Sequence, residues 1–151
     1  MQSLANGTLL QGGKYRIEQV LGQGGFGITY LANHNLQDRK VAIKELFING
    51  VNERLHTNEL VVSNSCNEML FSGQMKKFQK EAKRIMQLHD EHIVSVYELF
   101  NENNTVYYVM EYIEGETLSG IMKKQGRPFS FNEVDEIFKQ LIDTLSVIHS
   151  H

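Results

Sequence analysis

The sequence is short of several residue types, and each shortage excludes a class of protein. Its 151 residues include one cysteine (Cys66), one proline and no tryptophan. A single cysteine cannot form a disulfide within the chain, which is typical of proteins from a reducing compartment. No apolar run approaches the roughly 20 residues that a membrane-spanning helix needs, and residues 1–13 lack the basic and apolar regions of a secretory signal. We therefore expect a cytoplasmic chain with no membrane segment.

Neither sign of charge predominates in the sequence. The chain carries 15 basic and 18 acidic residues, a formal net charge of −3, and the basic residues are scattered along it. Nucleic-acid-binding domains usually show a clustered basic surface, so we expect no nucleic-acid partner, and we interpret the lysine pairs at 76–77 and 123–124 as solvated helix faces. His89, His92, His149 and His151 fall in two pairs. No cysteine or carboxylate set completes a metal site around either pair, so no metal site is expected.

What the chain does contain is a regular order of strand and helix patterns. Alternating, β-branched and aromatic residues predict five strands, and apolar residues at spacings of three and four predict helices. Residues 1–13 are interpreted as a flexible lead-in, and residues 48–73 as an irregular insertion with a short hairpin. The expected α+β order has strands at 14–22, 27–34, 39–47, 93–100 and 105–113, and helices at 73–90, 114–126 and 130–151.

The helices have clear end and face signals. Gly126 closes the short second helix, and Ser130 with Glu133 forms a capping-box pattern at the start of the last one. The first helix has a single apolar stripe, which predicts one face packed on the core. Its members are Met75, Phe78, Ala82, Ile85 and Leu88.

Three glycines, Gly22, Gly24 and Gly27, follow the first predicted strand in G-x-G-x-x-G order. In a dinucleotide-binding unit these glycines lead from a strand into a helix. Here they lead into "ITYLA", whose β-branched and aromatic residues favour a strand. A glycine hairpin can bind phosphates through its backbone amides. The same sequence is also compatible with a hairpin that binds no ligand.

A lysine stands inside the apolar run "VAIK". Alternation along a strand places Val41 and Ile43 on one face and Ala42 and Lys44 on the other. The second face pairs a small side chain with a cation, which leaves room for a flat ring beside an ammonium group. The ordinary alternative is a lysine that extends outward from the strand into water.

Glu81 supplies the discriminating pattern. It lies between Phe78 and Ile85 at helical spacing, beside the apolar stripe. An unpaired buried carboxylate costs about 3–5 kcal/mol, so we expect a cationic partner, and Lys44 is the candidate. In the alternative, Glu81 lies at the margin of the stripe and reaches water. A glycine hairpin, a strand lysine and a helix glutamate together can hold and orient a polyphosphate.

At this point the sequence resembles the protein kinase family, specifically the small lobe of bacterial serine/threonine kinases. The segment "GQGGFGITYLA" resembles the glycine-rich loop, and "VAIKE" resembles the lysine strand. The segment "KFQKEAKRIMQLHDEHIVSVYELF" resembles helix αC with the following strand, and "YYVMEYIEGETL" the fifth strand and hinge. The resemblance covers about residues 14–151. It implies a five-stranded antiparallel sheet with one helix and a hinge over residues 14–114, and the start of an incomplete large lobe, with helices αD and αE, over residues 115–151.

The resemblance also implies a cofactor and its binding residues. ATP is the implied cofactor, with Mg²⁺ in the intact enzyme. Lys44 holds the α- and β-phosphates and forms the catalytic ion pair with Glu81. Ala42 packs on adenine, Met110 is the gatekeeper, and Thr29 stands where the family usually has valine. The full implied set of ATP contacts is Leu21, Gly22, Gln23, Gly24, Gly25, Phe26, Gly27, Thr29, Ala42, Lys44, Met110, the backbone of Glu111 and Ile113, and Thr117.

Other motifs of the family do not occur in the sequence. The chain contains neither H-R-D nor D-F-G, the motifs that supply the catalytic aspartate and a metal ligand. We therefore expect a chain truncated before the catalytic loop, inactive alone and at most a weak nucleotide binder, whereas the intact enzyme phosphorylates a protein substrate.

Two further hypotheses stay open. The chain can be a non-catalytic kinase-like scaffold that binds proteins rather than the ATP-binding part of an enzyme. The apolar stripe of the last helix, from Val134 to Ile148, predicts a homo-oligomer if no large lobe covers it.

Overall fold

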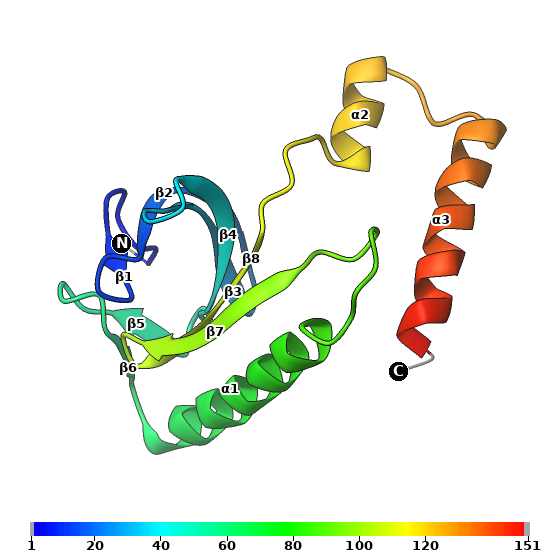
Figure 1. The fold of residues 1–151 in the computed structure, drawn as a ribbon. Helices are drawn as coiled ribbons and strands as arrows, with labels where there is room; N and C mark the ends of the chain where they lie inside the picture. Colours follow the sequence, from blue (N-terminus) through cyan, green and yellow to red (C-terminus); the bar gives the residue numbers. More distant parts are fainter. Residues whose placement is uncertain (1, 150–151) are drawn as a thin grey trace. The chain divides into compact units, whose positions relative to one another are not determined.

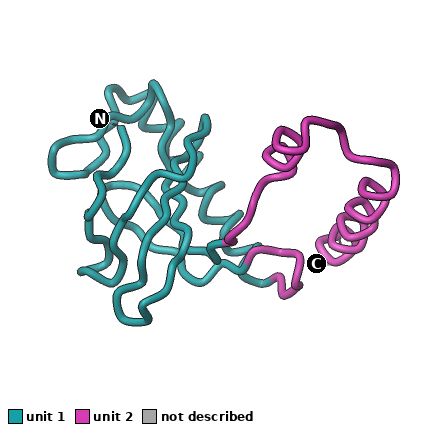
Figure 2. Tube along the Cα trace, turned by 90° about the horizontal axis from the view of Figure 1, so that it is seen from above, with its two compact units in different colours: residues 1–87, 95–112 teal, residues 88–94, 113–151 magenta. Residues whose placement is uncertain are grey.

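The computed structural model describes residues 2–149, in two compact units (Figure 2). Unit 1 contains the residues up to Gln87 together with Ser95–Tyr112. Unit 2 contains Leu88–Val94 and the residues from Ile113 onward. The predicted small lobe and hinge cover residues 14–114, whereas residues 88–94 and 113–114 belong to unit 2.

Unit 1 is built on one curled antiparallel sheet (Figure 1). All five predicted strands are present, and a short sixth strand joins them at one edge. The strand order is β1-β2-β3-β4-β8-β7, with bounds β1 Leu9–Leu10, β2 Tyr15–Gly24, β3 Gly27–His34, β4 Arg39–Leu46, β7 Val96–Glu102 and β8 Thr105–Glu111.

The segment before β2 corrects the expectation of a flexible lead-in. Within its described part, residues 2–13, β1 pairs with β2. Leu4 and Leu10 are buried in the core, at 3% and 0% exposure. The physical reason is that full burial of a leucine contributes about 1.5–3 kcal/mol, enough for two leucines to hold an otherwise polar segment against the sheet.

The expected insertion contains more regular structure than its sequence indicates. The short hairpin is present as β5 Asn52–Arg54 and β6 Leu60–Val62. Helix α1, Ser65–Ile85, begins at Ser65 rather than at Gly73, because the Asn64 side chain caps it by accepting a hydrogen bond from the Asn67 N–H at 2.9 Å. The polar cluster "SNSCNE" is thus a helix start.

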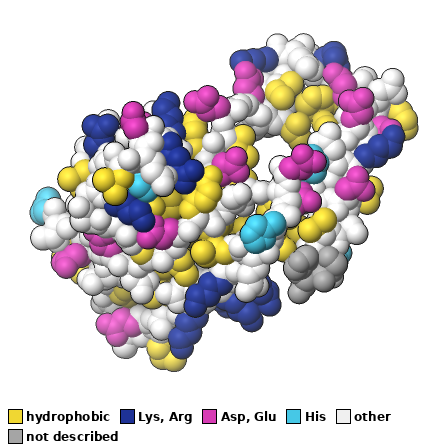
Figure 3. Space-filling model, viewed as in Figure 1, with side chains coloured by type: hydrophobic (Ala, Val, Ile, Leu, Met, Phe, Trp, Pro, Cys, Tyr) yellow, Lys and Arg dark blue, Asp and Glu magenta, His cyan; other side chains and the backbone are white. Residues whose placement is uncertain are grey.

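Helix α1 packs on the sheet through its apolar stripe. Phe71, Phe78 and Ala82 are buried, and the Phe78 and Tyr108 rings lie 4.9 Å apart between centroids. The opposite face is exposed and basic, so the Lys76–Lys77 pair is a solvated helix face as predicted; in Figure 3, Lys and Arg side chains gather over α1. The helix therefore presents a fixed inner face toward β8.

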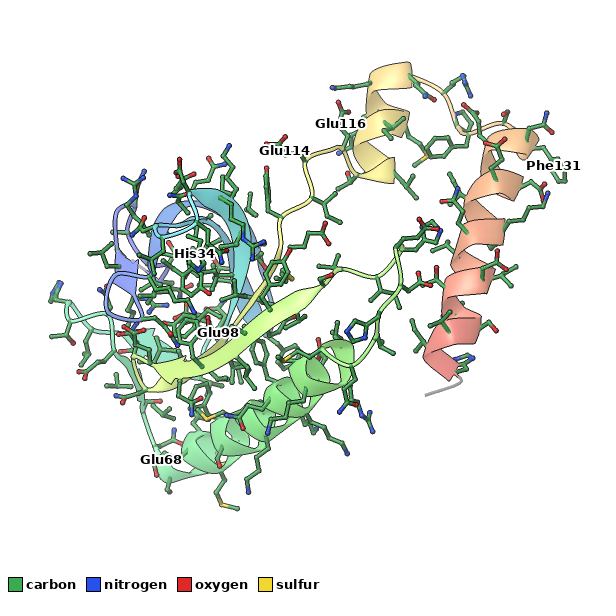
Figure 4. All side chains as sticks on the ribbon, in the orientation of Figure 1. His34, Glu68, Glu98, Glu114, Glu116 and Phe131 are labelled. Atoms are coloured by element: carbon green, nitrogen blue, oxygen red, sulfur yellow. The ribbon has the colours of Figure 1, made fainter. Side chains whose placement is uncertain are left out.

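A polar cluster connects the start of β2, the strand next to β1, with β7. The Glu98 carboxylate on β7 accepts hydrogen bonds from the Lys14 ammonium at 2.7 Å and the Tyr15 hydroxyl at 2.5 Å. The Tyr15 ring lies edge-on to His34, and Figure 4 shows His34 and Glu98 in unit 1. Burial acts to raise the pKa of Glu98, but the hydrogen bonds from Lys14 and Tyr15 hold it below its ordinary value.

Unit 2 contains two helices, α2 Leu118–Gln125 and α3 Phe131–His149. Gly126 ends α2 at φ 64°, as predicted. The capping box at the start of α3 is confirmed, because the Ser130 N–H donates to Glu133 at 2.7 Å and the Glu133 N–H to the Ser130 hydroxyl at 3.4 Å. Hydrogen bonds from Arg127 and Ser130 lower the pKa of Glu133 to about 2. The last two predicted helix residues, 150–151, lie outside the described residues.

The apolar stripe of α3 is exposed within unit 2. Figure 4 shows Phe131 projecting from the start of the helix, where its side chain is 84% exposed. No helix of residues 2–149 is long and apolar enough to cross a membrane. The exposed residues of the stripe itself are Val134, Phe138, Leu141, Ile142, Leu145 and Ile148.

Candidate functional site

The glycine-rich segment forms the hairpin between β2 and β3. Gly24 pairs with Gly27 at its tip, and a strand follows Gly27, which excludes the dinucleotide-binding arrangement. A Cβ added at Gly22, Gly24 or Gly25 meets no atom within 4 Å, and none of the three has a positive φ. Neither packing nor backbone conformation therefore requires glycine at these positions, and glycine leaves the backbone there open to close approach.

Gly27 is different, because its place is set by packing. A Cβ there lies 2.8 Å from the Glu45 carbonyl oxygen and 3.6 Å from Lys44 Cε. The third glycine of the motif thus allows β3 to lie against β4 directly beside the lysine. Among the other hairpin residues, Gln23 donates a hydrogen bond to Gln2 at 3.3 Å, and the Phe26 ring is 61% exposed.

Lys44 lies on β4, opposite Thr29 of β3 and Tyr108 of β8. Its ammonium nitrogen is 3.9 Å from Glu81 Oε1. The same nitrogen lies over the rings of Phe78 and Tyr108, 5.7 and 5.5 Å from their centroids. Strand and helix therefore bring Lys44 and Glu81 together on one side of the sheet.

The exposure of this pair corrects one part of the sequence argument. Glu81 was expected to be a buried carboxylate, but its side chain is 55% exposed, and that of Lys44 is 33% exposed. The helical spacing places Glu81 beside the stripe but does not show that it lies on the solvent side of that stripe. An exposed ion pair contributes about 0–1 kcal/mol. Glu81 by itself is therefore a weak anchor for Lys44.

The residues expected beside adenine lie partly in unit 1. Ala42 is buried on β4 and pairs with Met110 of β8, while Leu21 is 42% exposed on β2. The Glu111 N–H donates to the Ser95 carbonyl at 2.9 Å, so a ligand contact through its backbone falls to the carbonyl group.

Two further residues of the expected set of ATP contacts, Ile113 and Thr117, belong to unit 2. The Ile113 side chain is 62% exposed. The Thr117 hydroxyl accepts a hydrogen bond from the Gly120 N–H at 3.0 Å and caps α2, a structural role that the sequence analysis did not identify. Figure 4 shows Glu114 and Glu116 on the segment that leads to this cap.

Sequence reasoning missed a buried ionic cluster directly behind Lys44. Glu45 and Arg54 form an ion pair at 2.6 Å, with side chains 0% and 3% exposed. The Tyr30 and Tyr107 hydroxyls donate to the same carboxylate at 2.6 and 2.7 Å. A signal was present, because the alternation that places Val41 and Ile43 in the core places Glu45 there as well.

The electrostatics of this Glu45 cluster follow from its burial. Burial raises the pKa of the Tyr30 and Tyr107 hydroxyls, and the charge of Glu45 raises it further, so both remain hydrogen-bond donors. Burial acts to lower the pKa of Arg54, but the Glu45 charge holds it above its ordinary value. The cluster is therefore a fixed ion pair with two neutral phenols.

A curled antiparallel sheet, a glycine hairpin and a strand lysine beside a helix glutamate define the small lobe of a protein kinase. The sequence model of the protein kinase domain matches residues 15–151. The chain belongs to the protein kinase family, which confirms the resemblance stated from the sequence.

Relatives and solved structures agree with this membership. The chain is 32% identical to the serine/threonine-protein kinase PrkC of Bacillus subtilis over 92% of its length, and 31% identical to PksC of Streptomyces coelicolor over 94%. Among solved structures, the apo form of PpkA-294 superposes with a TM-score of 0.77 at 25% identity, over 83% of this chain and 44% of that one. The kinase domain of PknI from Mycobacterium tuberculosis gives 0.70 at 20% identity over 98% and 51%, and shows the fold alone.

The share of these relatives that the chain covers is small. It spans 18% of the length of PrkC and 23% of that of PksC, and about half of the solved kinase chains. The part it matches contains the glycine hairpin, Lys44 and Glu81.

Proposed function

We propose that residues 14–114 are the ATP-binding small lobe of a serine/threonine protein kinase, whose intact domain transfers the γ-phosphoryl group of ATP to serine or threonine of a protein. The observation that carries the proposal is the unobstructed glycine hairpin, whose third glycine packs beside the Lys44 side chain. The curated relatives named above are serine/threonine kinases, which supports this substrate class.

The residues present fit a nucleoside triphosphate. The open faces at Gly22, Gly24 and Gly25 let backbone amides approach phosphate oxygens closely. Lys44 is one-third exposed and supplies a cation to the phosphates. Mg²⁺ neutralises phosphate charge in the family's reaction, and the motifs by which the family holds it do not occur in this sequence.

The residues present predict that the chain binds ATP but does not catalyse phosphoryl transfer. The glycine hairpin and Lys44 can position the phosphates. The catalytic base and the metal ligands of phosphoryl transfer are not among these residues. We therefore propose that the 151-residue chain binds ATP weakly and does not phosphorylate a peptide. We also propose a cytoplasmic location, which is supported by the single, free cysteine of the chain.

A second candidate function is a non-catalytic kinase-like scaffold. The observation that favours it is the weak, half-exposed pairing of Glu81 with Lys44, since a scaffold does not need a tightly held lysine. The exposed stripe of α3 supplies an apolar surface for a partner or a second copy.

Thermal unfolding in the presence of ATP and Mg²⁺ distinguishes the two functions. A ligand at ten times its Kd stabilises the native state by about 1.4 kcal/mol, which raises Tm by about 3–6 °C for a chain of this size. Lys44→Met abolishes the rise if Lys44 binds phosphate. Lys40→Met is the matched control, because Lys40 is an exposed lysine on the same strand. An unchanged Tm of the unaltered chain supports the scaffold.

A further inference from the structure

The Glu45 cluster lies on the back of the strand that carries Lys44. We infer that Arg54, acting through Glu45, is a positioning residue that fixes Lys44 and the end of the glycine hairpin for nucleotide. This inference rests on the proposed ATP-binding function. It assigns to β4 and the β5–β6 hairpin the role that the sequence suggested for Glu81.

Glu45 lies on an inner strand of the sheet, between β3 and β8. It follows Lys44 on β4, so the two side chains project to opposite faces. The Glu45 carboxylate is fully buried and accepts three hydrogen bonds, from Tyr30, Tyr107 and Arg54, at 2.6–2.7 Å. Tyr30 belongs to β3 and Tyr107 to β8, the two neighbours of β4. The strand is thus held from both sides at the residue next to the lysine.

Arg54 connects this anchor to two segments outside the six-stranded sheet. Its Nε donates to the Gln2 carbonyl at 2.8 Å and its Nη1 to the Asn58 carbonyl at 2.9 Å, while its Nη2 pairs with Glu45. The Leu4 N–H donates to the Tyr30 hydroxyl at 3.1 Å. Residues 2–4 and the β5–β6 hairpin therefore both close over the buried carboxylate.

The Glu45 backbone also lies against the glycine hairpin. The position of a Cβ on Gly27 lies 2.8 Å from the Glu45 carbonyl oxygen and 3.6 Å from Lys44 Cε. A displacement of β4 at Glu45 must therefore move the lysine and the last glycine together. The two phosphate-binding parts share one support.

Glu81 contacts Lys44 less closely than Arg54 contacts Glu45. Its carboxylate lies 3.9 Å from the Lys44 ammonium and is half exposed, whereas the Glu45–Arg54 pair is 2.6 Å long and buried. An exposed pair at this distance contributes little. Removing one partner of a buried pair leaves an uncompensated charge, which forces its surroundings to rearrange. Lys44 is accordingly positioned by its own strand more than by α1.

Calorimetric titration of MgATP into the 151-residue chain and its variants tests this assignment. We expect Arg54→Met to raise the Kd for ATP at least about fivefold, measured where circular dichroism shows the variant folded. Arg54→Lys, which keeps the charge but not the three-way hydrogen bonding, falls between. Glu81→Gln raises the Kd less than Arg54→Met does. Arg16→Met, an exposed arginine on β2, is the matched control.

The titrations can overturn the inference in the following ways. An unchanged Kd in Arg54→Met, or a larger loss in Glu81→Gln, overturns it. If Arg54→Met does not fold, the comparison is made with Arg54→Lys, which keeps the charge but loses the three-way hydrogen bonding; an unchanged Kd there overturns the inference as well.

A second measurement separates this inference from the proposed function. Hydrogen exchange without nucleotide is expected to quicken in β4 and residues 22–28 of Arg54→Met, but not of Glu81→Gln. If the unaltered chain binds no ATP, the proposed function fails, and unequal exchange still shows that Arg54 supports the strand. Equal exchange in the two variants shows that Arg54 does not position Lys44.

Discussion

Replacing Arg54 by methionine should destabilise the folded chain strongly. The change leaves the Glu45 carboxylate buried at 0% exposure without its cation, and breaking such a pair costs about 3–5 kcal/mol. Proteins of this size are stable by about 5–15 kcal/mol. The single variant is therefore expected to lose a large part of its free energy of unfolding.

The double variant Glu45→Met with Arg54→Met should lose less than the sum of the two singles. Both charges are then absent, and the remaining cost is two buried hydroxyl donors. The Tyr30 hydroxyl still accepts from the Leu4 N–H, and the Tyr107 hydroxyl from Asn103. An unsatisfied buried donor costs about 1–3 kcal/mol, so the double variant should lose about 2–6 kcal/mol.

Urea unfolding followed by circular dichroism measures these values in a double-mutant cycle. The two single losses add to at least about 6–10 kcal/mol, because Glu45→Met also leaves the two hydroxyls without their acceptor, so we expect a coupling energy of about 3 kcal/mol or more between Glu45 and Arg54. If the singles are too unstable to measure, Tyr107→Phe gives a milder loss of about 1–3 kcal/mol. Additive losses in the cycle refute the reasoning, because they mean that the two charges do not depend on each other.

Three other expected outcomes follow from single contacts. Gly27→Ala should destabilise the chain by about 1–3 kcal/mol, because its Cβ lies 2.8 Å from a carbonyl oxygen, whereas Gly22→Ala should leave stability within about 0.5 kcal/mol; equal urea midpoints for the two variants contradict this. Glu98→Gln should cost about 1–2 kcal/mol at neutral pH. The folded-state pKa of Glu98 is lowered, so its stabilisation is present above its ordinary value of 4.5 and is lost as the pH falls through the lower folded-state value; a difference between variant and parent that persists at about pH 2 refutes this assignment. Finally, the exposed stripe of α3 predicts self-association of the 151-residue chain at micromolar concentration, which Leu141→Lys should weaken; a monomeric parent chain in light scattering counts against it.

The strands were predictable because their apolar residues repeat with a period of two. Alternation also fixed which face of β4 carries Lys44 and which faces the core. The same alternation also places Glu45 in the core. It was overlooked because a carboxylate seldom occupies a core position. Its partner Arg54 lies on another hairpin, and no local pattern pairs residues across such a connection.

The missed structure depends on contacts that are distant in sequence. Leu4 and Leu10 looked like isolated apolar residues in a polar segment, but both belong to a core cluster made of residues from several strands and from α1. The start of α1 was missed because polar residues after Asn64 form a cap rather than a loop. Glu81 was placed correctly on its helix, but its exposure depends on the distance between α1 and β4, which periodicity does not supply.

The affinity for ATP relative to adenosine tests the central claim most directly, because the two ligands differ only in the phosphates. We predict that the 151-residue chain binds ATP more tightly than adenosine, and that Lys44→Met removes this preference while Lys40→Met retains it. Equal affinities for ATP and adenosine in the unaltered chain contradict the claim that the glycine hairpin and Lys44 bind phosphate.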